Sequence, residues 1–503
     1  MKQDWIECTL QEAFETVTGN TPPKKEKENY GDEIPFIKPP QIENNTIITS
    51  LEYLSLKGKE KARILPINSV LVTCIGNLGR VGLNKKEVAF NQQINAIKPV
   101  SGIEAKFTFY QAQSIYFRNQ LEKLSTSTTV SLVNKTSFNS IRFKIAPLTI
   151  QKAIVKKIEA LFSDLDQGIA DLKKAQEQLK IYRQAVLKKA FEGELTKEWR
   201  EKQTNLPSAD ELLEQIKVER QKYYEEQIED WKKALKNWEK IVDEGKKPAK
   251  PQKIKQFNGI SEDDYCKLPK LPSSWDWEKF GNVCLKIMDG THFSPKNIEN
   301  GDFKYITAKN IKEGRIDLKN LSYVTKEDHL AIYARCDVKK GDILYIKDGA
   351  TTGRAAINNF DEEFSLLSSV GVFRTSHNLI LPKFLEHYLN AQITRNRMLS
   401  NIAGVAITRL TLVKLNNSVF IICSPEEQHQ IVKEIESRLS VCDAVEQNIS
   451  ESLEKAKALR QSILKKAFEG KLLSEEEIAQ CKAQPDYEPA SVLLEKIKKE
   501  KKK

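Results

Sequence analysis

The sequence predicts an α+β protein built by tandem duplication: two similar strand-rich domains are joined by two long helices, packed as an antiparallel coiled coil about a pseudo-two-fold axis. Two observations predict this fold. The segment 151–193 recurs in similar form at 428–470, at a constant shift of 277 positions (428 − 151) and without a gap. The segments that precede the two copies also share turn and strand signals in the same order.

Each copy of the repeat has the apolar pattern of a coiled-coil helix, with one apolar residue at every seventh position. Neither copy contains proline, and both end in Phe-Glu-Gly, which is typical of a glycine-capped helix. The predicted seam consists of Ile158, Leu165, Leu172, Leu179 and Val186 in the first copy and Ile435, Cys442, Ile449, Ala456 and Ile463 in the second. We place Leu161, Ala175 and Tyr182, and in the second copy Ile431, Val445 and Leu459, on companion positions of the same seam.

Each helix carries an apolar stripe that needs a partner, and the simplest partner is the other copy. A pseudo-two-fold relation between the repeats makes such a pair antiparallel. Helices of roughly 40 residues are about 55–60 Å long at ~1.5 Å per residue. The alternative, two unrelated charged helices in larger domains, leaves the shared register of the repeats unexplained.

Short β-type runs alternate with turn signals in the first domain, 1–147, and a helical spacing covers 107–124. The second domain, 263–423, shares this frame, because 31–38 matches 301–309 and 71–80 matches 343–354. The predicted strands of the first domain are 34–37, 47–48, 70–72, 94–97 and 141–145.

Helical and charged segments fill the rest of the chain. Residues 148–200 form a central helical spacer, 201–262 a charged helical insertion with a basic linker, and 424–473 a distal helical spacer. We interpret the linker as a solvated connection, with contact to phosphate as the alternative. Residues 474–503 are expected to form a charged tail whose lysine-rich end is frayed and solvated.

The 503 residues carry a net charge of +11, which favours an anionic partner. The eight cysteines are scattered, so neither a zinc site nor a disulfide framework is indicated, and free thiols in a reducing cytosol are expected. The chain shows no signal peptide and no apolar run of about 20 residues. We therefore expect a cytoplasmic protein without a membrane partner.

Motifs for catalysis are missing from the sequence. It contains no phosphate-binding loop of the form G-x-x-x-x-G-K-[ST] and no Asn/Asp-Pro-Pro-aromatic box of an amino-methyltransferase. The five histidines have neither metal-ligand spacing nor a triad arrangement, and we assign His387 and His429 to packing or to the surface. We therefore predict no catalytic residue and no metal site, and a binding protein that works inside an assembly.

Several motifs closely resemble the type I restriction-modification specificity subunits. They are the helix exit Arg-Gln-x-x-Leu-Lys-Lys-Ala-Phe-Glu-Gly at 183–193 and 460–470, the helix approaches 147–151 and 424–428, and the Leu-Pro-Ser-Ser-Trp preamble at 271–275. The hairpin motifs Gly-x-x-Gly-Arg at 76–80 and Gly-x-x-x-Gly-Arg at 349–354 belong to the same pattern. The resemblance covers almost the whole chain, although the first domain lacks the Leu-Pro-x-x-Trp preamble.

The resemblance implies that both domains are target recognition domains, each reading one half of an asymmetric, bipartite site in double-stranded DNA. The chain would be the non-catalytic subunit of an adenine methyltransferase and ATP-dependent endonuclease complex, with two modification and two restriction subunits as partners. It would hold no cofactor itself; S-adenosylmethionine would come with the modification subunits, and ATP and Mg with the restriction subunits. The alternative is a stand-alone DNA-binding or scaffold protein of the same architecture without methyltransferase partners.

Base reading needs loops rich in amide, guanidinium and hydroxyl groups, because arginine commonly pairs with guanine and Asn or Gln with adenine. For each candidate residue an ordinary turn or loop role is the alternative, and we assign Gly76, Gly79, Gly349 and Gly353 to turns rather than to phosphate binding. The candidates in the first domain are Lys38, Gln41, Asn77, Arg80, Asn91, Gln92, Gln93 and the run 125–129 with Thr128; those in the second are Lys309, Asn310, Thr351, Thr352, Arg354, Ser368, Ser369 and Arg409.

Overall fold

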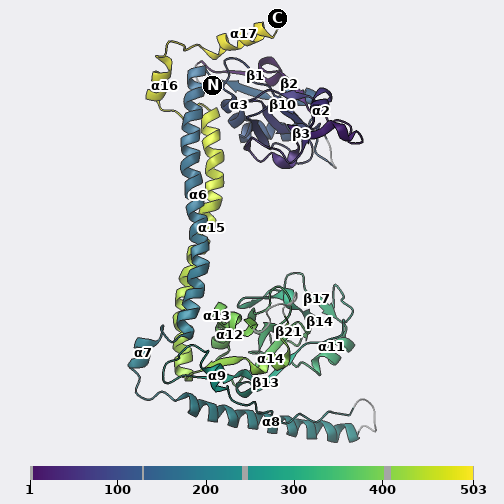
Figure 1. Cartoon of the computed structure of the whole chain (residues 1–503), viewed down its shortest axis with the longest axis vertical. Coiled ribbons are helices and arrows are strands. Elements are labelled where there is room, and N and C mark those ends of the chain that lie inside the picture. Colours follow the sequence, from purple (N-terminus) through teal and green to yellow (C-terminus); the bar gives the residue numbers. More distant parts are fainter. Residues whose placement is uncertain (1–3, 127–129, 241–246, 401–408, 502–503) are drawn as a thin grey trace. The chain divides into compact units, whose positions relative to one another are not determined.

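The computed structural model describes residues 4–126, 130–240, 247–400 and 409–501 (Figure 1). The chain forms two compact units: the first comprises Met1–Ala175 and Asn448–Lys503, and the second comprises Gln176–Gln447. Each unit contains one globular domain and one part of each long helix, so the long helices α6 (Leu148–Phe191) and α15 (Pro425–Phe468) each pass through both units.

The two long helices have equal lengths of 44 residues and equivalent ends. Gly193 and Gly470 follow them with φ of 77° and 71°, a left-handed conformation that glycine adopts without strain. Behind each glycine the next N–H turns back into the helix: Glu194 N donates to Lys189 O at 3.0 Å, and Lys471 N to Lys466 O at 2.8 Å. The predicted glycine caps are therefore present in both copies.

Equivalent ion pairs join the two long helices within each unit. In the second unit Arg183 Nη2 lies 2.6 Å from Asp443 Oδ1, and in the first unit Arg460 pairs with Asp166. Arg460 follows Arg183 by 277 positions (460 − 183), and Asp443 follows Asp166 by the same shift (443 − 166). The same pair thus forms twice with the roles of the helices exchanged, which confirms the antiparallel packing of the two helices within each unit and the equivalence of the repeats (Figure 1).

The predicted seam residues of the second copy are all buried, as are Ile158 and Val186 of the first, whereas Leu165, Leu172 and Leu179 are half-buried. Three predicted companions are wrong, because Tyr182, Val445 and Leu459 are 49%, 41% and 50% exposed. Four residues on from Ile158 the seam continues at Phe162, which is buried, whereas the residues four on from Leu179, Cys442 and Ala456 are Arg183, Glu446 and Arg460, which form ion pairs between the helices. Positions three and four residues away lie on opposite sides of an apolar stripe, and a seven-residue period does not distinguish them.

The first domain has two sheets. The strand order of one is β2-β10-β7-β8-β4 and that of the other β5-β3-β9-β6, with β3–β9 and β4–β8 parallel and the other pairs antiparallel; β1 pairs separately with β11. The strands are β1 (Ile6–Thr9), β2 (Thr16–Thr18), β3 (Tyr30–Ile37), β4 (Asn45–Ile47), β5 (Tyr53–Leu54), β6 (Ile64–Leu65), β7 (Val70–Thr73), β8 (Val81–Asn84), β9 (Val88–Phe90), β10 (Ile94–Ile97) and β11 (Arg142–Ile145). The helices are α1 (Leu10–Ala13), η1 (Lys27–Asn29), η2 (Pro39–Gln41), α2 (Leu56–Lys61), α3 (Ala105–Ala112), α4 (Ile115–Lys123) and α5 (Lys135–Asn139).

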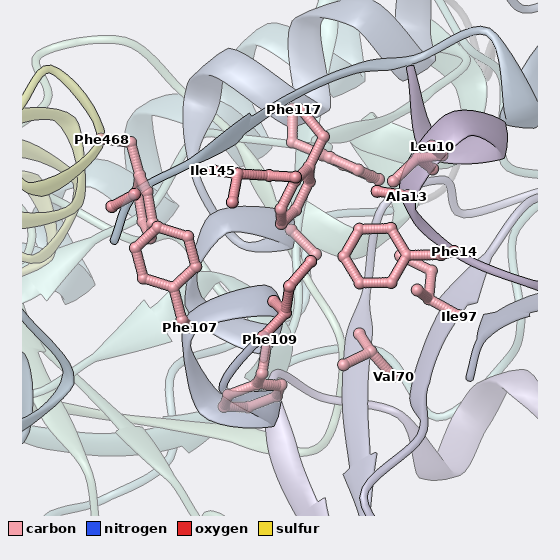
Figure 2. Packing of buried hydrophobic residues seen from close by; sticks show 14 of the residues in the cluster. Leu10, Ala13, Phe14, Val70, Ile97, Phe107, Phe109, Phe117, Ile145 and Phe468 are labelled. Carbon is pink, nitrogen blue, oxygen red and sulfur yellow. The ribbon is translucent and has the colours of Figure 1, made fainter. Parts of the chain in front are cut away.

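Aromatic residues form the centre of the first unit's core (Figure 2). Phe107 of α3 meets Phe468, at the end of α15, edge to face with 5.2 Å between ring centroids. Phe14 and Phe143 form a second edge-to-face pair at 5.0 Å. Burial of each such side chain contributes about 1.5–3 kcal/mol, so the end of the distal helix is an integral part of the first domain's core.

The second domain repeats the core of this topology, although in its described residues the two sheets lack strands equivalent to β4 and β6. Its main sheet has the order β13-β21-β18-β19, and a second sheet, β17-β14-β20, contains the parallel pair β14–β20. Phe384 and Phe191 meet with 5.5 Å between ring centroids. Phe384 is the equivalent of Phe107 (384 − 107 = 277), and Phe191 is the equivalent of Phe468 (468 − 191 = 277), so this contact repeats the one in the first unit. Equivalent strands and equivalent aromatic contacts thus occur in the same order in both domains, which confirms the tandem duplication.

The strands of the second domain are β12 (Asp276–Lys279), β13 (Lys286–Asp289), β14 (Phe303–Ile306), β15 (Ile311–Lys312), β16 (Arg315–Ile316), β17 (Ser322–Val324), β18 (Ile343–Ile346), β19 (Ala355–Ile357), β20 (Ser365–Leu366), β21 (Val370–Arg374) and β22 (Val419–Ile422). Strand β12 pairs with β22, and β15 with β16. The helices are α9 (Glu262–Tyr265), α10 (Phe280–Val283), η3 (Ala308–Asn310), α11 (Lys326–Tyr333), α12 (Pro382–Asn390), α13 (Gln392–Leu399) and α14 (Leu412–Asn417).

A buried glutamine attaches each domain to the start of its long helix. The Gln151 amide donates to Ala146 O at 2.7 Å and accepts from Glu104 N at 2.8 Å. The Gln428 amide does the same with Cys423 O at 2.9 Å and Leu381 N at 2.9 Å. Because Glu104 and Leu381 precede α3 and α12, both glutamines bind an N-terminal N–H that has no partner within its own helix.

The second unit has a buried carboxylate, Glu427, where the first unit has Ile150 at the equivalent position. Glu427, 1% exposed, accepts hydrogen bonds from Thr196 Oγ1 at 2.7 Å, Arg200 Nε at 2.8 Å and Trp275 Nε1 at 2.7 Å. Arg200 lies on α7 (Lys197–Glu201), and Trp275 ends the Leu-Pro-Ser-Ser-Trp preamble. The preamble thus contacts the ends of both long helices, because Thr196 comes shortly after the end of α6 and Glu427 lies in the first turn of α15.

The charged insertion begins with α8 (Ala209–Lys240), whose Ala209, Leu212 and Ile216 are buried in the second unit's core. The charged tail forms α16 (Glu475–Lys482) and α17 (Ala490–Glu500), and α17 packs on α1. The lysine-rich end that we expected to be frayed is attached in its described part, because Lys501 Nζ donates to Phe14 O at 2.7 Å. The residues of α17 that lie in the first unit's core are Ala490, Leu493, Leu494 and Ile497. Their helical spacing among lysines was the signal of an amphipathic helix.

Candidate nucleic-acid interface

Several loops of the first domain meet at one edge of its sheets. Asn91 N donates to Ile37 O at 3.1 Å, which joins the β9–β10 connection to the end of β3. Cys74 N donates to Gln93 O at 2.8 Å, and Gly76 N to Ser131 O at 2.8 Å. The structure therefore brings together the candidate residues that follow β3, β7 and β9, which are far apart in the sequence.

Most of these candidates have partners within the chain. The Lys38 amine pairs with Glu52, and Gln41 Nε2 donates to Ser50 Oγ at 2.7 Å. Gln92 Oε1 accepts from Thr21 Oγ1 at 2.6 Å, and Gln93 Oε1 from Asn91 Nδ2 at 3.0 Å. Each amide retains further donor or acceptor capacity, so these contacts orient the amides and leave groups with which bases could bond.

The β7–β8 turn presents Asn77 and Arg80. Gly76 and Gly79 both have φ of 77°, as expected for turn glycines. Thr73 Oγ1 closes the turn by donating to Asn77 O at 2.6 Å and accepting from Arg80 N at 3.0 Å. Asn77 is exposed, and the Arg80 side chain is 37% exposed with its Nη1 3.9 Å from Glu43 Oε1. Thr128 lies outside the described residues.

The second domain forms the equivalent edge. Lys347 N, after β18, donates to Ser369 O at 2.9 Å, and Lys347 O accepts from Leu410 N at 2.8 Å. Leu367 N donates to Ile306 O at 3.2 Å, which joins the β20–β21 connection to the end of β14. The loops with the candidates of 309–310, 351–354, 368–369 and 409 thus converge at this edge.

The candidates of the second domain differ in exposure. Asn310 is buried and caps η3, because it accepts from Thr307 N at 3.1 Å and donates to Asp317 O at 3.1 Å. Thr352 is buried and donates to Gly349 O at 2.7 Å. Arg354, Ser369 and Thr351 are half-buried, whereas Lys309 and Arg409 are exposed. The exposed cations of this edge are accessible to an anionic ligand.

A cluster of charged residues at this edge was missed by the sequence reasoning. Asp289, at the end of β13, is buried and lies against Lys347, Arg335 and His292. Lys347 stands just before the Gly-x-x-x-Gly-Arg motif, but Arg335 and Asp289 are 46 positions apart, so no local pattern connects them.

His387 and Cys74 are buried, whereas His429 is exposed. Among the described residues no group of three or more His, Cys, Asp or Glu is arranged to hold a metal ion. Burial lowers the pKa of His387 to about 3, and His429 is exposed with its Nδ1 2.7 Å from Pro425 O. Burial also raises the pKa of the Cys74 thiol to about 12, which keeps it protonated and poorly nucleophilic. Within the described ranges no helix has the length and apolarity needed to span a bilayer.

Comparison with known proteins gives consistent matches across the chain. The family model described as "Type I restriction modification DNA specificity domain" matches residues 2–174 and 272–455, one match in each repeat. The type I restriction enzyme EcoBI specificity subunit of Escherichia coli is 26% identical over 502 residues, covering 99% of this chain and 92% of the relative. The EcoKI specificity subunit of Escherichia coli (strain K12) is 23% identical over 521 residues, covering 100% and 96%.

A chain of the solved structure "Structural basis underlying complex assembly and conformational transition of the type I R-M system" has a similar fold. Its TM-score is 0.61 at 17% identity, over 93% of this chain and 98% of that chain. The family model matches more than half of the sequence and does so in both repeats, in agreement with the duplicated fold. This chain therefore belongs to the family of type I restriction-modification specificity subunits.

Proposed function

We propose that the chain determines the DNA sequence on which a type I restriction-modification complex acts, with each domain reading one half of an asymmetric bipartite site. One observation carries this proposal: two domains that share a core strand order present different side chains at the same edge. A shared frame supplies the same docking geometry, and unlike loops supply unlike base contacts. The two half-sites should therefore differ in sequence.

The polar groups at the two edges fit direct reading of bases. The first domain offers Asn77, Gln92 and Arg80, which suit adenine and guanine edges in the major groove. The second offers Lys309, Thr351 and Arg409 at the equivalent loops. The net charge of +11 supplies the attraction to phosphate that nucleic-acid binding requires.

The long helices fit the role of a spacer between half-sites. Each has 44 residues, which corresponds to about 66 Å at ~1.5 Å per residue. Half-sites one helical turn apart are separated by ~34 Å, well within this length. The heptad seam and the two equivalent ion pairs, Arg183–Asp443 and Arg460–Asp166, favour a single register of the helices, which a spacer of defined length needs.

We further infer that the chain is not catalytic and docks subunits that are. Two equivalent repeats offer two equivalent surfaces, which supports binding of two copies of a modification subunit about the pseudo-two-fold axis. S-adenosylmethionine would enter with those subunits for adenine methylation, and ATP and Mg²⁺ with two restriction subunits. The complex would act on DNA in the cytoplasm.

Co-expression with the modification subunits tests this proposal. We expect the chain to co-purify with two copies of the methyltransferase, and the complex to methylate adenine in one bipartite motif, mapped by sequencing of modified bases. The isolated chain should bind the same motif without methylating or cleaving it. Sequence-specific binding without association with a methyltransferase would instead favour a stand-alone DNA-binding or scaffold protein.

A further inference from the structure

The carboxylate of Asp289 is the centre of a cluster that we call the Asp289 cluster: Asp289, His292, Arg335 and Lys347. Asp289 is 3% exposed. Its Oδ1 accepts from Arg335 Nη2 at 2.8 Å, and its Oδ2 lies 3.3 Å from both Lys347 Nζ and His292 Nε2. One buried anion thus holds side chains from three separate segments.

Three neighbouring strands place Lys347 within reach of Asp289. Asp289, Gly371 and Tyr345 lie side by side on β13, β21 and β18. A Cβ on Gly371 would lie 3.7 Å from Lys347 Cδ, so the lysine stem passes over the glycine to reach Asp289. Lys347, 2% exposed, also lies 3.4 Å from Asp348 Oδ2. Its charge is therefore compensated by two carboxylates.

The first domain has neutral residues at the same three places. Thr18 ends β2 as Asp289 ends β13, and Cys74 follows β7 as Lys347 follows β18. Between them Asn95 occupies the position of Gly371; it accepts from Thr18 Oγ1 at 2.6 Å and lies within hydrogen-bonding reach of Cys74. A neutral, hydrogen-bonded triad is thus sufficient to build this fold. Buried ion pairs are weak sources of stability, so a charged version in one domain suggests a role specific to that domain.

The cluster lies at the edge where the candidate DNA-reading loops meet. Thr291 N, two residues after Asp289, donates to Leu366 O at 2.8 Å, and Thr291 O accepts from Ser368 N at 2.8 Å. Arg409 Nε lies 3.6 Å from Asp348 Oδ1, and the same carboxylate neighbours Lys347. The Arg335 side chain is 51% exposed although its Nη2 is bound to Asp289.

We propose that Arg335 contacts a guanine in the half-site read by the second domain, and that Asp289 is its positioning residue; this rests on the proposed function. The carboxylate binds one guanidinium nitrogen and leaves the remaining N–H groups for an acceptor pair such as guanine O6 and N7. Because the anchored side chain is already ordered, less rotamer entropy is lost when the base is bound. Lys347 and His292 complete the surroundings of the carboxylate.

Four variants in the complete complex with its modification subunits test the proposal: Arg335→Ala, Arg335→Lys, Asp289→Asn and the double variant Arg335→Ala/Asp289→Asn. Binding is measured on a library that randomises each half-site in turn. We expect Arg335→Ala to reduce the preference for guanine at one position of the second-domain half-site by about 10- to 100-fold, and to leave the first-domain half-site unchanged. Arg335→Lys should lose the same preference while keeping overall affinity, because the ammonium lacks the planar fork.

Asp289→Asn should relax the preference at that same position, and the double variant should match Arg335→Ala alone, because Asp289 acts through Arg335. The matched control is Lys340→Ala, which removes an exposed ion pair with Asp361 at 3.0 Å. Lys340 precedes β18, whereas Lys347 of the Asp289 cluster follows the other end of that strand. This variant should leave both half-sites unchanged.

Equal weakening of all sequences by Arg335→Ala, with a reduced salt dependence, would make Arg335 a phosphate contact and overturn the proposal. Additive effects in the double variant would overturn the positioning role of Asp289. A wild-type complex that prefers no motif would contradict the proposed function itself. If the wild-type complex reads a defined motif and the Arg335 and Asp289 variants keep the same base preferences in the second-domain half-site, this inference is contradicted while the proposed function stands.

Discussion

The spacer role of the long helices predicts a change in the DNA site when both helices are lengthened. We consider a seven-residue insertion in α6 between Ala175 and Gln176 and a matched insertion in α15 between Gln447 and Asn448, at the sequence boundaries of the two compact units. Seven residues preserve the heptad phase, so the seam and the ion pairs of Arg183 and Arg460 can form as before. Each helix becomes about 10 Å longer at ~1.5 Å per residue.

At ~3.4 Å per base pair, the preferred gap between the half-sites should grow by about 3 bp while both half-site sequences stay the same. The assay is binding selection, or mapping of methylated adenine, with a library in which the gap length varies. A seven-residue insertion in the connection between α16 and α17 is the control and should leave the gap unchanged. An unaltered gap in the doubly lengthened protein would refute the spacer role.

Three further predictions concern single residues. Glu427→Ala leaves the donors of Thr196, Arg200 and Trp275 without their buried acceptor, so denaturant unfolding of the second unit should show a loss of about 3–5 kcal/mol; the control Glu214→Ala, which removes an exposed ion pair with Lys217, should cost less than about 1 kcal/mol. Burial lowers the pKa of His387 from 6.5 to about 3, so below pH 6.5 the unfolded chain binds a proton that the folded chain does not. Stability should therefore fall by about 2 kcal/mol between pH 7.5 and pH 5, and His387→Asn, followed by thermal unfolding at both pH values, should remove that dependence. Arg80→Ala should relax the preference in the first-domain half-site only; an equal loss of affinity for every DNA sequence in a binding assay would identify a phosphate contact instead.

The duplication and its helices were predictable because their signals are periodic patterns in the sequence. The 277-position shift, the seven-residue spacing and the glycine caps each depend on residues close together in the chain. The companion positions at Tyr182, Val445 and Leu459 were wrong because the side of the stripe depends on how two helices meet. The helix α17 was hidden by its lysine content, although Leu494 and Ile497 pack in the core.

The candidate site was predictable only as far as its loops. Turn glycines and polar residues marked the β7–β8 and β18–β19 hairpins, and the structure brings those loops to equivalent edges. Burial was not predictable: Asn310 carries a base-reading amide, but that amide caps its own helical turn. The Asp289 cluster joins residues from three segments, and such a contact exists only once the sheet has formed.

Exchange of one domain provides the most direct test of the central claim that each domain reads its own half-site. Residues 263–423 would be replaced by the corresponding domain of a family member, with both long helices retained, and methylated adenines would be mapped in cells that also express the modification subunits. We predict a motif in which one half changes to the donor's half-site, while the other half and the gap length persist. A motif altered in both halves, or unaltered in both, would contradict the account.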